Sequence, residues 1–147
     1  MEEQLAANSA AGSHALEHDH CWLFRPQPDA EISVGPPPLG VSVIDLSLMV
    51  FGKIFPRVAQ KHRLQMLNHF NDCIKTAKAN KLEVLQINIF TALLSGMKGL
   101  VEDKTTFGGS EVVSAGTSLI SSVLTSANPL LRCAAGECLG RIAQVKQ

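Results

Sequence analysis

Apolar side chains recur every three or four residues from about Ser42 onward, and this spacing constrains the fold more than any other feature. It is typical of helices that bury one face, whereas a half-buried strand would alternate apolar and polar residues. No segment of the chain shows a strand pattern of comparable strength. We therefore expect an all-α fold of about five helices over residues 42–147.

The first two expected helices are separated by a proline. Ser42 and Asp45 resemble a capping box at the start of the first helix, and Pro56 ends or resets it. The second helix is expected over about residues 58–79, with a turn at Asn80. The apolar stripe of the first helix, the usual sign of a core-facing side, consists of Val43, Leu46, Val50 and Ile54.

The third expected helix, about residues 82–101, is apolar on nearly every side, so neighbouring helices should cover more than one of its faces. The fourth helix begins near Ser110. Asn128 and Pro129 provide an N-cap and a first-position proline for the fifth helix. Close approach of neighbouring helices is expected at the small residues of this last helix, Ala134, Ala135, Gly136 and Gly140.

The helices group into hairpins of roughly 40 residues, the length of HEAT and armadillo repeats. The second and third helices form one hairpin, the fourth and fifth form another, and the first resembles the second half of a preceding unit. A polar terminal repeat normally caps such an array, and none is visible before Gln147. We expect a fragment or short isoform of a longer α-solenoid, with marginal stability or self-association.

Residues 1–41 differ in composition from the helical part. Prolines disfavour helix and central strand between Pro26 and Pro38, and we interpret the segment as a disordered, acidic, proline-rich tail and linker. Its apolar cluster, Cys21-Trp22-Leu23-Phe24, leaves local docking open. The N-terminus lacks the basic start and apolar run of a signal peptide.

Cysteine and histidine spacing does not indicate a cofactor. Four potential zinc ligands lie near the start of the chain: His14, His18, His20 and Cys21. A solvated tail is the simpler interpretation of that segment. The four cysteines contain no CxxC pair, which fits a reducing compartment, and Cys133 and Cys138 are expected to be small packing residues. No P-loop or nucleophile motif is present, so we expect no enzymatic activity.

Charge is unevenly distributed, although thirteen Lys and Arg residues balance thirteen Asp and Glu residues. Seven of the acids lie at or before Asp45, where Arg25 is the only base. The bases that follow are the candidate interaction residues: Lys53, Arg57, Lys61, Arg63, Lys75, Lys78 and Lys81. They suit anionic lipid or an acidic partner, or they simply solvate the exposed side of a helical hairpin. The low aromatic content, 5%, argues against nucleic-acid binding through stacked bases.

The most apolar window of the sequence, residues 82–94, is interrupted by polar side chains and is shorter than the span of a bilayer. We therefore expect a cytoplasmic protein whose association with membranes is peripheral at most.

Residues 128–142, Asn128-Pro129-Leu130-Leu131-Arg132 to Arg141-Ile142, resemble the second helix of a HEAT repeat and the asparagine–proline helices of clathrin-adaptor large subunits. More specifically, residues 26–147 resemble the HEAT-repeat-containing protein 5 family. The matching stretches are residues 36–40, 48–56 and 61–67.

This resemblance implies a small internal part of a very long solenoid that has no catalytic motif. It implies a scaffold role with the clathrin adaptor of the trans-Golgi network and endosomes, together with aftiphilin and gamma-synergin, in endosome-to-Golgi traffic. The alternative, which rests on charge alone, is a basic peripheral module that binds anionic membrane or an acidic partner through Lys53 to Lys81.

Overall fold

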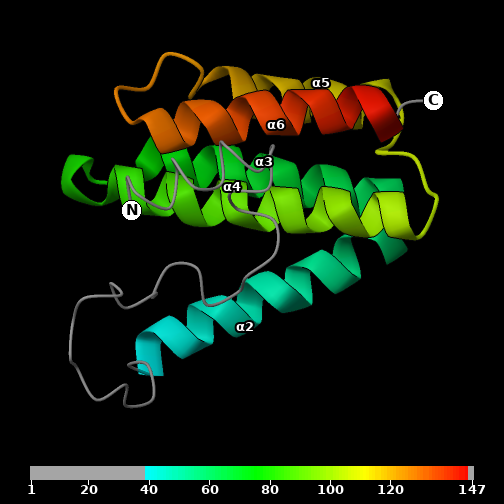
Figure 1. Ribbon diagram of the computed structural model, residues 1–147, viewed down its shortest axis with the longest axis horizontal. Helices are drawn as coiled ribbons and strands as arrows, with labels where there is room; N and C mark the ends of the chain where they lie inside the picture. The colour runs from blue at the N-terminus through cyan, green and yellow to red at the C-terminus, as the bar shows by residue number, and fades with distance from the viewer. Residues whose placement is uncertain (1–38, 146–147) are drawn as a thin grey trace, which may run out of the picture.

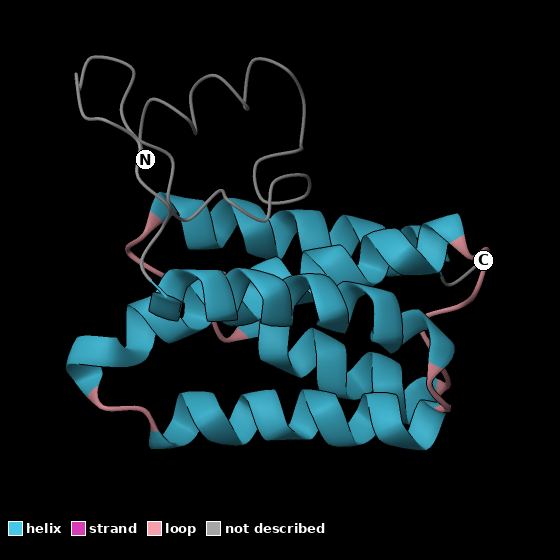
Figure 2. Cartoon of the chain, turned by 90° about the horizontal axis from the view of Figure 1, so that it is seen from below, coloured by secondary structure: helices cyan, strands magenta, loops and turns pink. Residues whose placement is uncertain are grey.

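The computed structural model describes residues 39–145, which form helices joined by short loops (Figures 1 and 2). The elements are α2 (Leu39–Ile54), the 3-10 turn η2 (Phe55–Arg57), α3 (Gln60–Thr76), α4 (Ala79–Glu102), α5 (Ser110–Ser121) and α6 (Pro129–Val145). No strand occurs within these residues. The prediction of an all-α fold is confirmed.

The start of α2 differs from the prediction. Residues 39–41, which we had assigned to the tail, are already helical. The proposed capping box of Ser42 and Asp45 therefore lies inside α2, and that prediction is wrong. Asp45 is 5% exposed and belongs to the buried side of the helix. Pro56 ends α2 as expected, because the chain continues into η2.

The turn between α3 and α4 also lies earlier than expected. Ala77 and Lys78 have extended backbone angles and form the connection, so Asn80 is part of α4 and the predicted turn there is wrong. At the start of α6 the prediction is confirmed. The Asn128 side-chain oxygen accepts a hydrogen bond of 2.8 Å from the Leu130 backbone N–H, and Pro129 takes the first helical position.

Alternate helices pack against one another in two rows (Figure 1). One row contains α2, α4 and α6, which run in the same direction, and the other contains α3 and α5, which run the opposite way (Figure 1). α4 lies between α2 and α6. Its buried residues occupy several sides of the helix, so the prediction that neighbours cover it on more than one face is confirmed.

A single hydrophobic core connects the two rows. Its largest fully buried side chains include Leu67 from α3, Phe90 and Met97 from α4, Leu119 from α5 and Leu131 from α6. From α2, Leu48 is buried and the half-buried Phe51 packs against this core, whereas the fully buried Phe55 comes from η2. α2 is therefore attached mainly by its contact with α4 rather than by large core side chains.

Glycines allow that contact to be close. A Cβ atom on Gly52 of α2 would collide with the Ser95 side chain of α4. A Cβ atom on Gly99 would lie 2.7 Å from the Gly52 carbonyl oxygen and 2.6 Å from Cγ of Pro56. Gly99 is therefore required by the approach of the two backbones, and a side chain at Gly52 would force Ser95 to move.

The small residues of α6 follow the prediction only in part. Ala134 and Ala135 are buried as expected. Gly136 and Gly140 are exposed, and a Cβ atom on either would meet nothing within 4 Å. The expected close approach at these two glycines is wrong, because they lie on the side of α6 that faces away from its neighbours.

Gly99→Ala should therefore destabilise the fold. The added methyl group meets backbone and a rigid proline ring, so we expect the free energy of unfolding to fall by about 2 kcal/mol. Gly136→Ala is the matched control, since removing an open helical glycine should raise stability by roughly 0.5–1 kcal/mol. Urea unfolding followed by circular dichroism measures both, and equal stabilities for the two variants would contradict the close α2–α4 contact.

Candidate functional site

α2 presents an apolar face that no helix of the described part covers. Val43, Leu46, Val50 and Ile54 are 54%, 59%, 54% and 42% exposed. This is the stripe that the sequence indicated as core-facing, and that interpretation is wrong. The opposite side of α2, which includes Leu48 and Gly52, packs against α4 because the small Gly52 lets the backbones meet.

The exposed stripe forms one wall of an open groove of about 470 Å³, which we call the α2 groove. Phe51 of α2 and Met66 of α3, both half-buried, line the groove together with the stripe. The polar side chain in the lining is Ser47, whose hydroxyl donates a 2.7 Å hydrogen bond to the Val43 carbonyl oxygen. The groove therefore offers an almost wholly apolar surface.

Aromatic stacking positions the inner side of this groove. The Phe51 ring lies 5.3 Å from the Phe70 ring and 5.1 Å from the Phe55 ring, and the Phe55 ring lies 5.9 Å from that of Phe107. The rings connect α2, η2, α3 and the loop before α5. A change at Phe51 would consequently disturb both the groove and the core.

The sequence did not single out Phe51 or Met66. The spacing of Gly52, Pro56 and Gly99 was the available signal, because small residues in apolar helices identify the side on which a neighbouring backbone approaches. When the side of α2 that carries Gly52 packs against α4, the stripe that includes Val43 and Leu46 must face outward.

The candidate basic residues do not form one surface. Lys53, Arg57 and Lys61 lie near η2, whereas the remaining exposed lysines of the set, Lys75, Lys78 and Lys81, lie around the α3–α4 turn at the opposite end of α3 (Figure 1). Lys61 and Lys75 are separated by about 21 Å along α3. That distance exceeds the screening length of about 8 Å at physiological ionic strength, so the two groups act independently.

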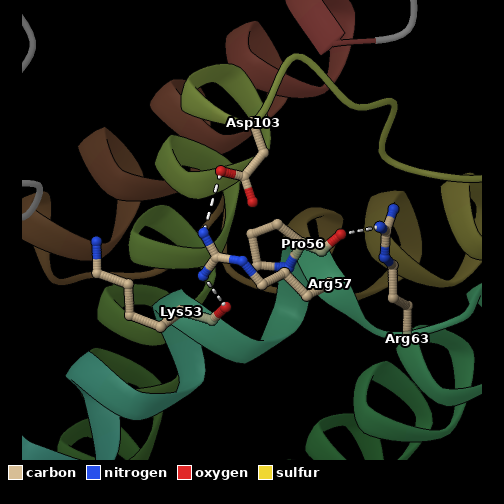
Figure 3. A network of polar contacts seen from close by, with 5 residues as sticks. All are labelled: Lys53, Pro56, Arg57, Arg63 and Asp103. Atoms are coloured by element: carbon tan, nitrogen blue, oxygen red, sulfur yellow. Dashed lines mark hydrogen bonds and ion pairs between the residues drawn. The ribbon is translucent and has the colours of Figure 1, made fainter.

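Arg57 is partly engaged within the fold. Its guanidinium donates a 2.8 Å hydrogen bond to the Lys53 carbonyl oxygen and forms a 3.2 Å ion pair with Asp103 (Figure 3). The Arg57 side chain remains 61% exposed, so this pair contributes little to stability.

Arg63 is not a surface residue, and its inclusion among the candidate interaction residues is wrong. It is 7% exposed, and its guanidinium donates hydrogen bonds to the carbonyl oxygens of Phe55 (3.0 Å), Pro56 (2.5 Å), Thr106 (2.6 Å) and Phe107 (3.0 Å). Figure 3 shows the bond to Pro56. Burial lowers the pKa of this guanidinium from its ordinary value. Arg63 therefore joins η2 to the loop before α5 and is unavailable to a partner.

The cysteines divide between core and surface. Cys138 is fully buried in α6, as expected of a packing residue, whereas Cys133 is exposed and the same prediction is wrong for it. Burial raises the pKa of the Cys138 thiol, Glu137 raises it further, and Arg141 acts in the opposite direction. The Cys138 thiol consequently stays protonated and unreactive.

A polar groove of about 850 Å³ lies between α3 and α5. Ser110, Ser114 and Ser118 line it beside Asp72 and Glu111. No histidine or cysteine lines this groove in the part of the chain that the structure describes, so its serines have no imidazole base to activate them.

Metal ligands do not cluster in residues 39–145, where no group of three or more His, Cys, Asp or Glu side chains could hold an ion. The proposed zinc ligands His14, His18, His20 and Cys21, and the apolar cluster that ends at Phe24, lie outside the described residues.

α4 is the one helix between Leu39 and Val145 that is long and apolar enough to cross a membrane by length and composition. Its best window has a mean hydropathy of 1.4. The window of residues 82–94 considered in the sequence covers only part of α4, which has 24 residues. However, 56% of the window is buried inside the fold, and its core position accounts for its composition.

Comparisons with known proteins assign no family. No protein-family model matches the chain, and no solved structure matches it significantly. The resemblance to the HEAT-repeat-containing protein 5 family therefore stays a prediction.

Arg63→Lys should destabilise the protein although it keeps the positive charge. A lysine ammonium is a compact charge that cannot reproduce the forked contacts to four carbonyl oxygens, so we expect a loss of about 3 kcal/mol. Arg57→Lys, the exposed control, should change stability by less than about 1 kcal/mol. Chemical denaturation compares them, and similar stabilities would contradict the role assigned to Arg63.

Native-state labelling with a thiol reagent should separate the two cysteines of α6. Cys133 should react readily, and Cys138 only after the protein is unfolded, because its thiol is buried and its pKa is raised. Peptide mapping by mass spectrometry identifies each labelled site. Equal labelling of both residues in the native protein would mean that α6 does not pack as described.

Proposed function

We propose that this chain is a non-enzymatic scaffold of the HEAT or armadillo type that binds another protein through the α2 groove. Packing of alternate helices in two rows, parallel within each row, supports the α-solenoid assignment. The resemblance of residues 26–147 to the HEAT-repeat-containing protein 5 family supports it independently.

The observation that carries the proposal is the position of the α2 groove. It is lined by α2 and by Met66 of α3, on the side of α3 away from α5. A further helix of the α3–α5 row would pack at this place. The groove therefore lies where a neighbouring helix of that row would lie. A partner that presents an amphipathic helix, with apolar residues three and four apart, would fill it.

The apolar lining also favours a protein partner over a polyanion. Contiguous exposed apolar surface is characteristic of interaction sites. The basic alternative is weakened because Arg63 is buried and the other bases are divided between the two ends of α3. Binding to anionic membrane would moreover be lost at high salt, whereas apolar docking would persist.

By resemblance, the partners are aftiphilin, gamma-synergin and the clathrin adaptor of the trans-Golgi network and endosomes. The protein would then act in the cytoplasm, at the surface of those compartments, in endosome-to-Golgi traffic. Such a role requires recognition along a surface and no chemical step.

Leu46→Asp combined with Val50→Asp should weaken binding to purified aftiphilin or gamma-synergin at least about tenfold, because both substitutions place charge in an apolar contact. Val84→Asp is the matched control, since Val84 is 62% exposed on α4 and lies outside the groove. Titration calorimetry at low and high salt measures the affinities.

Two results would contradict the proposal. One is that the groove variant and the control bind equally well. The other is that binding disappears at high salt and on charge reversal of Lys53 and Lys61, which would favour the basic alternative instead.

A further inference from the structure

The α2 groove selects its occupant by excluding polar groups. Val43, Leu46, Val50 and Ile54 present only hydrocarbon, and the Ser47 hydroxyl is already bonded to the backbone of its own helix. A polar segment would lose its hydrogen bonds to water on entering and gain none. The occupant must therefore carry bulky apolar side chains.

The chain itself contains such a segment before α2. Cys21-Trp22-Leu23-Phe24 is the most apolar run in residues 1–38, and it includes the only tryptophan of the protein. An aromatic residue followed by leucine and phenylalanine supplies the large contact area that an open apolar groove requires.

The connecting residues allow this run to reach the groove. Residues 25–38 lie between Phe24 and the start of α2, and they span at most ~45 Å when fully extended. The whole of α2 is about 24 Å long, so every part of the groove lies within reach. Covalent connection of this kind gives an effective concentration on the order of millimolar, and a site with a dissociation constant of ~0.1 mM would be about nine-tenths occupied.

Charge favours the same contact. The apolar run is flanked by Glu17 and Asp19 on one side and by Asp29 and Glu31 on the other. Exposed Lys53 immediately precedes the groove residue Ile54 on α2, and exposed Lys61 lies at the start of α3. Such surface pairs add little affinity, but opposite charge around an apolar contact fixes where it forms.

We propose that Trp22, Leu23 and Phe24 dock into the α2 groove of the same chain and cover the exposed face of α2. A second copy of the protein would have to compete with the connected segment, and at micromolar concentration it would lose that competition. A partner for this face must displace the segment, so its apparent affinity falls by the fraction of molecules in which the groove is open. The docking itself requires no partner and stands apart from the function proposed above.

Fluorescence of Trp22 tests the proposal in the full-length protein, because no other tryptophan contributes. Acrylamide quenching and the emission maximum are compared with those of a free peptide of residues 15–31. We expect emission at shorter wavelength and a several-fold smaller quenching constant in the protein than in the peptide. Both values should be independent of protein concentration over a roughly hundredfold range, as an intramolecular contact requires.

Variants locate the docking site. Leu46→Asp with Val50→Asp should shift the emission and quenching of Trp22 to the values of the free peptide, whereas Val84→Asp should leave them unchanged. All the substituted residues are exposed, and far-ultraviolet circular dichroism confirms that the helices are retained.

Three results would overturn the proposal. The first is a wild-type Trp22 as accessible as the tryptophan of the free peptide, a measurement that needs no variant. The second is protection that increases with protein concentration, which would assign the groove to a second copy. The third is protection that survives the groove substitutions. Because no partner is added, none of these results decides whether aftiphilin or gamma-synergin binds.

Discussion

α4 must be covered by other helices on opposite sides, and the arrangement of those helices follows from this constraint. α4 is buried over most of its length, and its buried positions include neighbouring residues such as Ile89, Phe90 and Thr91, which point in different directions. A helix of this kind cannot lie at the surface with one apolar stripe turned inward, because another stripe would face water. α6 covers one side with Leu131, Ala135 and other core residues, and α2 covers another.

The contact of α6 with α4 differs in kind from the contact of α2 with α4. α6 is inserted into the core through large and small side chains alike, whereas α2 approaches α4 through Gly52 and contributes few large residues. Arg63 compensates at the end of α2, since its four hydrogen bonds hold η2 against the loop that precedes α5. α2 is thus anchored at its C-terminal end by a polar clamp and along its length by backbone proximity.

This arrangement explains which predictions succeeded. Helix positions follow from local periodicity and from residues such as Pro56 and Asn128, whose effect on the backbone is fixed by their own chemistry. Coverage of α4 on several sides also follows from its own composition. Each of these features is encoded within a short segment, so a single sequence is enough to find it.

The failures concern contacts between distant segments. α2 is apolar on two sides, and periodicity alone cannot decide whether Val43 and Leu46 or Leu48 and Gly52 turn inward; the fit of Gly52 to Ser95 decides it. Arg63 has the sequence surroundings of an exposed base, but its partners include carbonyl oxygens more than forty positions away in the chain. For the same reason, the sequence does not show that the candidate basic residues lie in two groups. The folded structure places these groups at opposite ends of α3.

The packing of α2 against α4 and the exposed groove on its other side have a joint consequence. A ligand that binds the groove contacts α2 and Met66 of α3 together, so it adds to the apolar contact that Phe51 and Phe70 already make between these helices. Binding to the folded state alone stabilises that state in proportion to the occupancy of the site. The packing of α2 and the occupation of its groove are therefore thermodynamically coupled. Whatever fills the groove, within the chain or from a partner, also determines how firmly the first helix is held against α4.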